Sequence, residues 1–233
     1  MDEKKQKVLD LLDKVEAKMD ELTQRVNSTL SSLPFYMNWV ADKFLKLWDD
    51  VRAKVSEFWR KVGEFVSWLG DPVRLLDAKD KWNELATPIA ARPIAMGQSA
   101  VDREWKGRAA DAYADSIGDQ KEALKAIQSS LTNPIGSALV PIAAGIVAFW
   151  VLLIVTIAAL VFGIVACIAE AATGVGLVAV PPTALAAFGT AIASIVTGIA
   201  TLAGTAWTSQ NSFQNVTNEV AAFGPTSWPK AFE

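Results

Sequence analysis

A long apolar stretch dominates the second half of the chain. From Ser137 to Trp207 the only charged residue is Glu170, which divides the stretch into two apolar arms, residues 142–168 and 184–207. As α-helices these arms would be roughly 40 Å and roughly 36 Å long, at about 1.5 Å per residue. A bilayer hydrocarbon core of about 30 Å needs about 20 apolar residues, so either arm is long enough to cross it with tilt.

The segment between the arms carries the signals of a helix break. Gly174 and Gly176 accept backbone conformations with positive φ, and the pair Pro181–Pro182 cannot continue a helix. Glu170 lies beside this break, which favours a solvated loop position over a mid-membrane one, where an ionisable group would be a candidate functional site. The sequence therefore predicts an antiparallel helical hairpin with all five of these residues in its turn.

Small residues recur at four-residue spacing along both arms. They are Ala159, Gly163 and Cys167 in the first arm, and Gly189, Ala193, Ser194, Gly198, Ala200 and Gly204 in the second. Such rows let helix backbones approach closely in lipid, where no hydrophobic force drives helices together. They predict closure of the hairpin or packing between copies of the chain, although alanine and glycine are also simply common in apolar helices.

Composition narrows the classes of function. The 233 residues are 52% hydrophobic, which is more apolar than a soluble domain of this size, and the net charge of −3 comes without any basic block. The chain has no histidine and one cysteine, so it lacks the commonest general base, the commonest metal ligand and an internal disulfide. We therefore expect no enzyme activity, no cofactor, no metal site and no nucleic-acid partner.

One motif could suggest a nucleotide cofactor. Residues 174–179 match the loose dinucleotide-binding pattern Gly-x-Gly-x-x-Gly/Ala. That pattern needs a strand before it, a helix after it and an acidic residue about 20 positions further on. The next acidic residue is Glu219, and no strand–helix–strand unit is predicted around the motif, so we interpret it as part of the hairpin turn.

Two amphipathic helices are predicted before residue 70. Apolar side chains recur in steps of three and four over residues 3–32 and again over about 37–69. The second helix also carries four tryptophans, at Trp39, Trp48, Trp59 and Trp68. Tryptophan suits helix interfaces and membrane interfaces alike, but the balanced charge of this region favours a partner helix over lipid. The charged N-terminus is not that of a cleavable secretory signal.

Gly70-Asp71-Pro72 marks a boundary, because Gly suits a helix C-terminus, Asp an N-cap and Pro a first helical position. We expect a new helix from Pro72, kinked or split by Pro88 and Pro93, and another after Gly107 that Asn133–Pro134 ends. The predicted fold is all-α. Its segments are two amphipathic helices (1–70), a helical hairpin (71–136), the apolar hairpin (137–207) and an irregular tail (208–233).

The middle segment carries a family resemblance. Trp105-Lys106-Gly107 lies between two predicted helices and is followed by alanines at 109 and 110. Together with the lead-in at residues 70–72, this arrangement over about residues 70–132 resembles the WXG family of type VII secretion substrates. The resemblance implies a dimeric helical hairpin in a bacterial, actinobacterial host. An ordinary helical hairpin with Trp105 as an aromatic plug remains the alternative.

The resemblance also implies export without a cleavable signal. Family members often carry a C-terminal Tyr-x-x-x-Asp/Glu export element, whereas here Tyr36 is followed four residues later by Val40 and Tyr113 by Ile117. Because both tyrosines depart from this element, we do not expect the chain to be exported in its own right, and its export would require an export-competent partner. The amphipathic helices and the apolar hairpin lie outside the pattern of the short family members.

Two functional hypotheses account for these features. The leading one is a type VII-secretion-associated protein whose amphipathic helices shield the apolar hairpin and then open, so that the hairpin enters a bilayer as a pore-forming or membrane-depolarising toxin. The alternative is a resident two-span membrane protein whose helical module serves docking or homo-oligomeric assembly. Both predict location at a bacterial membrane, reached by secretion in the first case. The expected partners are a lipid bilayer, a helical protein or second copy, and the type VII machinery.

Overall fold

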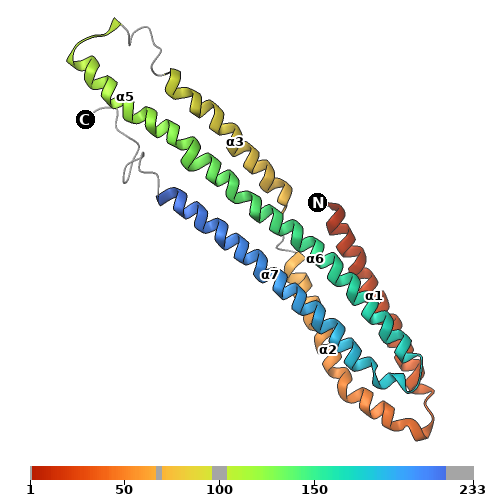
Figure 1. The fold of residues 1–233 in the computed structure, drawn as a ribbon. Helices are drawn as coiled ribbons and strands as arrows, with labels where there is room; N and C mark the ends of the chain where they lie inside the picture. Colours follow the sequence, from red (N-terminus) through yellow and green to blue (C-terminus); the bar gives the residue numbers. More distant parts are fainter. Residues whose placement is uncertain (1, 67–69, 96–103, 219–233) are drawn as a thin grey trace. The chain divides into compact units, whose positions relative to one another are not determined.

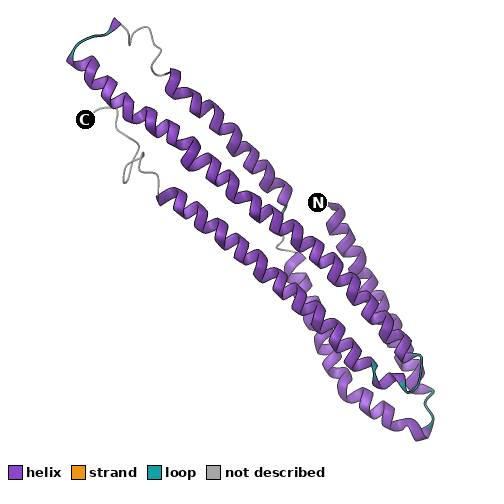
Figure 2. Cartoon of the chain, in the orientation of Figure 1, coloured by secondary structure: helices purple, strands orange, loops and turns teal. Residues whose placement is uncertain are grey.

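The computed structural model describes residues 2–66, 70–95 and 104–218. These residues form helices and contain no strand (Figure 2), which confirms the predicted all-α fold. The helices, drawn in Figure 1, are α1 (Asp2–Ser31), α2 (Asn38–Val66), α3 (Pro72–Ala95), α5 (Arg108–Ile127), α6 (Asn133–Ala171) and α7 (Val180–Asn218). Short 3₁₀ turns, η1 (Phe35–Met37) and η3 (Gly176–Val178), lie in two of the connections, and a π-helical segment, η2 (Gln128–Thr132), joins α5 to α6.

Two expected helix breaks are absent. Pro88 and Pro93 are expected to kink or split the third helix; they do not split it, because α3 runs on to Ala95. An interior proline costs about 3 kcal/mol, and we attribute the persistence of α3 to packing, since Ala86 is buried and α3 lies against α5 (Figure 1). The hairpin turn does break the chain at residues 172–179, but the prediction that Pro181 and Pro182 lie in it is wrong. α7 begins at Val180 with both prolines in its first turn, where a missing N–H needs no partner.

The prediction that Asn133–Pro134 ends a helix is also wrong. Helical backbone continues from α5 through η2 into α6, and the N–H of Asn133 bonds the carbonyl of Gln128. A proline in an α-helix clashes with the carbonyl four residues earlier. The wider π turn directly before Pro134 relieves this crowding, so the helix bulges and does not stop.

Contacts divide the chain into two compact units. Unit 1 comprises residues 1–70 and 146–202, and unit 2 comprises residues 71–145 and 203–233. The chain passes from unit 1 to unit 2 at Gly70–Asp71, at the boundary that the sequence also marks. The other two borders fall inside α6 and α7, so each long helix contributes residues to both units.

Unit 1 is a bundle of α1, α2 and the adjoining parts of α6 and α7. Its core consists of the apolar faces that the three-and-four spacing predicts for α1 and α2, packed on the two apolar arms. The buried residues are Val8, Leu12, Val15, Leu22 and Val26 of α1; Val40, Phe44, Val51, Phe58 and Val62 of α2; Leu153, Ile157, Leu160 and Ile164 of α6; and Ala184, Phe188 and Ile195 of α7. The amphipathic helices therefore bury their apolar faces within the same chain.

Unit 2 is built around α3 and α5, which pack side by side as the two arms of a hairpin (Figure 1). Ile117 and Ala123 of α5 are buried, as is Ala86 of α3. Gly136, at the start of α6, lies against α3 so closely that an added Cβ would meet the Asn83 Oδ1 at 3.1 Å. The predicted irregular tail is wrong as far as residue 218, because α7 continues to Asn218; residues 219–233 lie outside the described part of the chain.

Candidate functional site

The apolar hairpin of unit 1 is the candidate site, because two helices of this chain are long and apolar enough to cross a membrane. We call residues 146–202, with their turn, the hairpin, and we call α1 and α2 together the sheath. Aromatic side chains join the two. The rings of Phe58 and Phe188 meet edge to face with centroids 5.7 Å apart, and those of Phe65 and Phe149 lie 5.1 Å apart. Each pair connects α2 with one arm of the hairpin, so the sheath holds both arms.

The tryptophans of α2 divide between the core and the surface. Trp48 stacks on Phe44 at 4.7 Å, and Trp59 lies edge-on to Phe58 at 5.5 Å, so both are half-buried beside core phenylalanines. Trp39 is exposed, and the ammonium group of Lys43 lies 5.4 Å from the centre of its ring. Trp68 lies outside the described residues. Two of the four tryptophans thus support helix packing within the bundle.

Two of the predicted small residues bring the arms of the hairpin together. A Cβ added at Gly163 of α6 would lie 2.7 Å from the Cβ of Ala187 on α7. A Cβ added at Gly198 of α7 would collide with Leu152 and would lie 2.9 Å from the ring of Phe149. Cys167 is also buried there, with its sulfur 3.8 Å from the carbonyl oxygen of Val180. Gly163 and Gly198 therefore lie at the contact that closes the hairpin, and a side chain at Gly163 would meet the second arm directly.

The other small residues lie away from this contact. Nothing lies within 4 Å of a Cβ added at Gly189 or Gly204. Ala159, Ala193 and Ala200 are exposed, and Ser194 is half-buried. The predicted row of the second arm therefore divides between two faces of α7, one that closes the hairpin and one that is uncovered.

The sheath covers one side of the hairpin and leaves the other side open. Each arm has a most apolar stretch of 18 residues. In α6 33% of that stretch is buried, and in α7 22% is buried, whereas the core helix of a soluble protein is mostly buried. Large exposed apolar side chains follow one face of α6, spaced one or two helical turns apart: Val147, Val151, Val155, Phe162 and Val165. An uncovered apolar face of this kind marks a surface for a protein or a membrane.

The prediction that Glu170 lies in a solvated loop is wrong. Glu170 lies in the last turn of α6. It is half-buried, and its Oε1 accepts a hydrogen bond from the Thr183 hydroxyl of α7 at 3.0 Å. Its Oε2 is buried and has no hydrogen-bond partner among the described residues. The one carboxylate of the apolar region thus links the two arms across their turn.

The turn of the hairpin and the turn of the sheath lie together at one end of unit 1. The Thr29 hydroxyl donates to the carbonyl of Ala171 at 2.7 Å. A Cβ added at Gly174 would lie 3.1 Å from Leu33 and 3.2 Å from the Cε of Met37. Gly176 has no room for a side chain, since a Cβ there would collide with the carbonyl oxygen of Glu170. Close packing therefore excludes a side chain at Gly176, whereas one at Gly174 would displace the ends of Leu33 and Met37 slightly.

The Trp-x-Gly segment of unit 2 forms the start of α5. Gly107 precedes the helix with φ 109° and ψ 177°, a region open essentially to glycine alone. The exposed ring of Trp105 lies 5.4 Å from the ring of Tyr113, eight residues further along. Glycine is needed here for its backbone conformation, and Trp105 lies at the surface of unit 2 and is not a plug in its core.

Unit 2 also holds an open cavity of about 470 Å³ between the start of α6 and the end of α7. Five hydroxyl-bearing residues, two prolines and one alanine line it: Ser137, Thr205, Thr208, Ser209, Ser212, Pro134, Pro141 and Ala138. No charged side chain takes part in this lining. Among the described residues no group of three or more Cys, Asp or Glu side chains could hold a metal ion.

Sequence reasoning missed the residues that attach the sheath to the hairpin. Phe58, Phe188 and Phe149 occur in patterns that predict only burial, and nothing in the sequence indicates which partner each one meets. Thr29 and Thr183 donate the hydrogen bonds at the turn, but no sequence pattern distinguishes them from the other threonines. The apolar spacing could have identified the phenylalanines as core residues, and no more than that.

Comparisons with known proteins add no relative. No family model, no curated protein and no solved structure matches this chain.

Proposed function

We propose that this chain is a membrane-inserting protein whose apolar hairpin is held in a sheathed state by α1 and α2 and enters a bilayer when that sheath opens. The observation that carries the proposal is the one-sided cover of the hairpin. Its arms are apolar enough to span a membrane and only 33% and 22% buried, yet the helices packed on them have charged outer faces. The packed bundle and the inserted hairpin are therefore two different states.

The charges of the sheath exclude insertion of the whole bundle. Exposed Asp13, Lys14 and Asp20 lie in the middle of α1, and exposed Asp49, Asp50 and Arg52 lie in the middle of α2. A charged residue at the centre of a membrane helix costs about 2.5 to 3.5 kcal/mol on insertion scales. Six of them would cost on the order of 15 to 20 kcal/mol by the same scale. The sheath must separate from the hairpin before the hairpin can cross.

The energy of insertion is large enough to open the bundle. An apolar residue at the centre of a membrane helix contributes about −0.3 to −0.6 kcal/mol, so about 20 of them contribute roughly −6 to −12 kcal/mol per arm. A folded domain is stable by about 5 to 15 kcal/mol. The two magnitudes are similar, so contact with a bilayer can offset the loss of the sheath contacts. This balance suits a protein that is soluble first and membrane-bound later.

We also propose an association with type VII secretion and a toxic, pore-forming or membrane-depolarising action. The support for the first is the Trp-x-Gly segment of residues 105–107 between the paired helices α3 and α5, together with the exposed ring of Trp105. The support for the toxic action is that a sheathed, soluble state is useful only to a protein that must travel before it inserts into a membrane. An export-competent partner would supply the signal that the family pattern requires.

One observation favours the alternative of a resident two-span protein that assembles with copies of itself. Gly189, Ala193, Ala200 and Gly204 lie on α7 outside the contact that closes the hairpin. Small residues on an uncovered membrane helix allow close packing with another helix. In that case the protein would be found in the membrane from its synthesis onward.

Fractionation without detergent separates the two proposals. A soluble, monodisperse protein that later becomes carbonate-resistant on added vesicles and releases an entrapped dye supports the inserting protein. A carbonate-resistant pellet from the start supports the resident protein. A soluble protein that never becomes carbonate-resistant with vesicles at any pH contradicts both.

A matched pair of variants sharpens this test. Val155→Arg places a charge on the uncovered face of α6, where the side chain is exposed, so the soluble fold is unaffected. Insertion should fall about 100-fold, the equivalent of about 2.5 to 3.5 kcal/mol. Ala112→Arg, at an exposed position of α5 outside the hairpin, is the control and should insert as the wild type does.

A further inference from the structure

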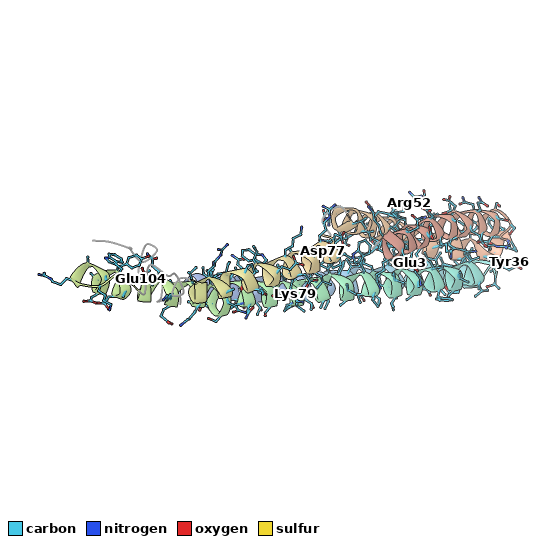
Figure 3. All side chains as sticks on the ribbon, turned by 90° about the horizontal axis from the view of Figure 1, so that it is seen from above. Glu3, Tyr36, Arg52, Asp77, Lys79 and Glu104 are labelled. Atoms are coloured by element: carbon cyan, nitrogen blue, oxygen red, sulfur yellow. The ribbon has the colours of Figure 1, made fainter. Side chains whose placement is uncertain are left out.

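The end of unit 1 where the two turns meet carries an exposed apolar surface. Phe35 is 89% exposed, Tyr36 is 78% exposed and Val175 is 65% exposed. Figure 3 shows Tyr36 at this end of the sheath. We call the η1 turn (Phe35–Met37) and the hairpin turn (residues 172–179) together the tip. Leu33 and Met37 both lie against Gly174, so the tip is one continuous surface.

The tip has no exposed charge. Residues 26–41 of the sheath contain no Asp, Glu, Lys or Arg, and neither do residues 171–218. The nearby carboxylate of Glu170 accepts its hydrogen bond from Thr183, and its second oxygen is buried. Elsewhere on α1 and α2, charged side chains occur in every turn or two. Of the sheath surface, only the part at this end of the bundle therefore has no charged side chain.

We propose that the tip is the first point of contact with a lipid bilayer, with Phe35 and Tyr36 entering the boundary between headgroups and acyl chains. This inference rests on the proposed insertion of the hairpin and names the surface that begins it. A bilayer is the fitting partner because Tyr and neighbouring Trp39 are residue types of the membrane interface. A basic surface would be required to recognise an anionic partner, and the tip has none.

The position of the tip gives the contact a direction. It contains the turn of the hairpin itself, so docking places both arms end-on to the bilayer, with the turn leading. The leading turn, residues 172–179, contains no charged residue, and Glu170 lies behind it in the last turn of α6. Since no charge takes part, docking should need no anionic lipid and should not weaken in high salt, where screening removes electrostatic attraction.

The test is flotation of the full-length protein with phosphatidylcholine vesicles, in low and in high salt. The wild type should float equally in both. Phe35→Ser combined with Tyr36→Ser should weaken vesicle binding on the order of 100-fold, about tenfold for each aromatic side chain removed from the lipid. Both side chains are exposed, so circular dichroism of the variant should be unchanged. Leu45→Ser, at an exposed position on the side of α2, is the matched control and should float as the wild type does.

Separate readouts distinguish failure of this inference from failure of the proposed function. If the double variant floats and inserts as fast as the wild type, the tip is not the docking surface, although insertion stands. If the wild type floats through its tip but never becomes carbonate-resistant, the docking surface stands and the insertion proposal fails. Binding that requires anionic lipid, or a tip whose loss changes only the oligomeric mass in light scattering, would overturn the inference in favour of an anionic surface or a second copy.

Discussion

Phe58→Ala removes the largest side chain that attaches the sheath to the second arm of the hairpin. Phe58 and Phe188 are both fully buried, and their rings meet edge to face. Truncation of such a side chain costs about 3 to 5 kcal/mol, because the buried surface is lost and a cavity remains. The cost falls on the contact between α2 and the hairpin, so the variant should spend more time with the sheath open.

The native thiol can report this opening, because Cys167 is the single cysteine of the chain and is buried. Cys167 lies one helical turn before Ala171, whose carbonyl accepts a hydrogen bond from Thr29 of the sheath. The thiol itself packs against the second arm, with its sulfur 3.8 Å from the carbonyl oxygen of Val180, so a reagent reaches it only when this end of the bundle loosens. Its labelling by a maleimide therefore measures the open fraction when closing is fast.

The labelling rate of Phe58→Ala should rise about 100-fold to 4,000-fold, since each 1.4 kcal/mol is tenfold. Leu45→Ala, at an exposed position of the same helix, should stay within about twofold of the wild type. The loss of stabilising free energy in the double variant Phe58→Ala/Phe188→Ala should be smaller than the sum of the two single losses by about 0.5 to 1.5 kcal/mol, the value of an aromatic pair. Equal labelling rates in Phe58→Ala and wild type would refute the idea that this contact holds the sheath closed.

Three further predictions concern individual positions. Gly163→Val should destabilise unit 1 by about 1 to 3 kcal/mol in urea denaturation, because the Cβ meets Ala187, whereas Gly189→Ala, in open space, should not destabilise it. Gly107→Ala should cost about 1 to 3 kcal/mol through its positive φ, while Gly118→Ala in the middle of α5 should stabilise by up to about 1 kcal/mol in the same assay. The hydrogen bond from Lys54 lowers the pKa of Glu57 below its ordinary value of 4.5, so the stabilisation is present above that pH and is lost as pH falls through the lowered pKa. Lys54→Met should remove this part of the acid-side stability profile, and an unchanged profile would contradict the assignment.

Local signals in the sequence predict most of the secondary structure. The three-and-four spacing of apolar residues places α1 and α2, and the glycines at 174 and 176 place the hairpin turn, although Pro181 and Pro182 begin α7 instead of lying in the turn. The same signals fail where a longer-range contact outweighs them. Pro88 and Pro93 stay inside α3 despite their cost, and Pro134 follows a π turn that accommodates it. A proline in isolation predicts a break, but the packing of the whole helix decides whether the break occurs.

The candidate site is less predictable than the helices. Four-residue spacing nominates small residues on several faces of α7 at once, and the structure selects Gly198 for the close contact while leaving Gly189 and Gly204 open. Burial could likewise be expected for Phe58 and Phe188, but the contact between their two rings could not. The position of Glu170 beside a turn suggested solvent, whereas Thr183 from the other arm reaches it.

The sequence by itself determined that this chain is helical, that two of its helices can cross a membrane, and where they turn. Those properties depend on the length of apolar runs and on Gly and Pro, which act within a few residues of themselves. Only the tertiary structure decided which side of the hairpin the sheath covers, which glycines close it and which apolar surface remains at the tip. These depend on the rotation of each helix about its axis, and that rotation is set by side chains far away in the sequence packing together.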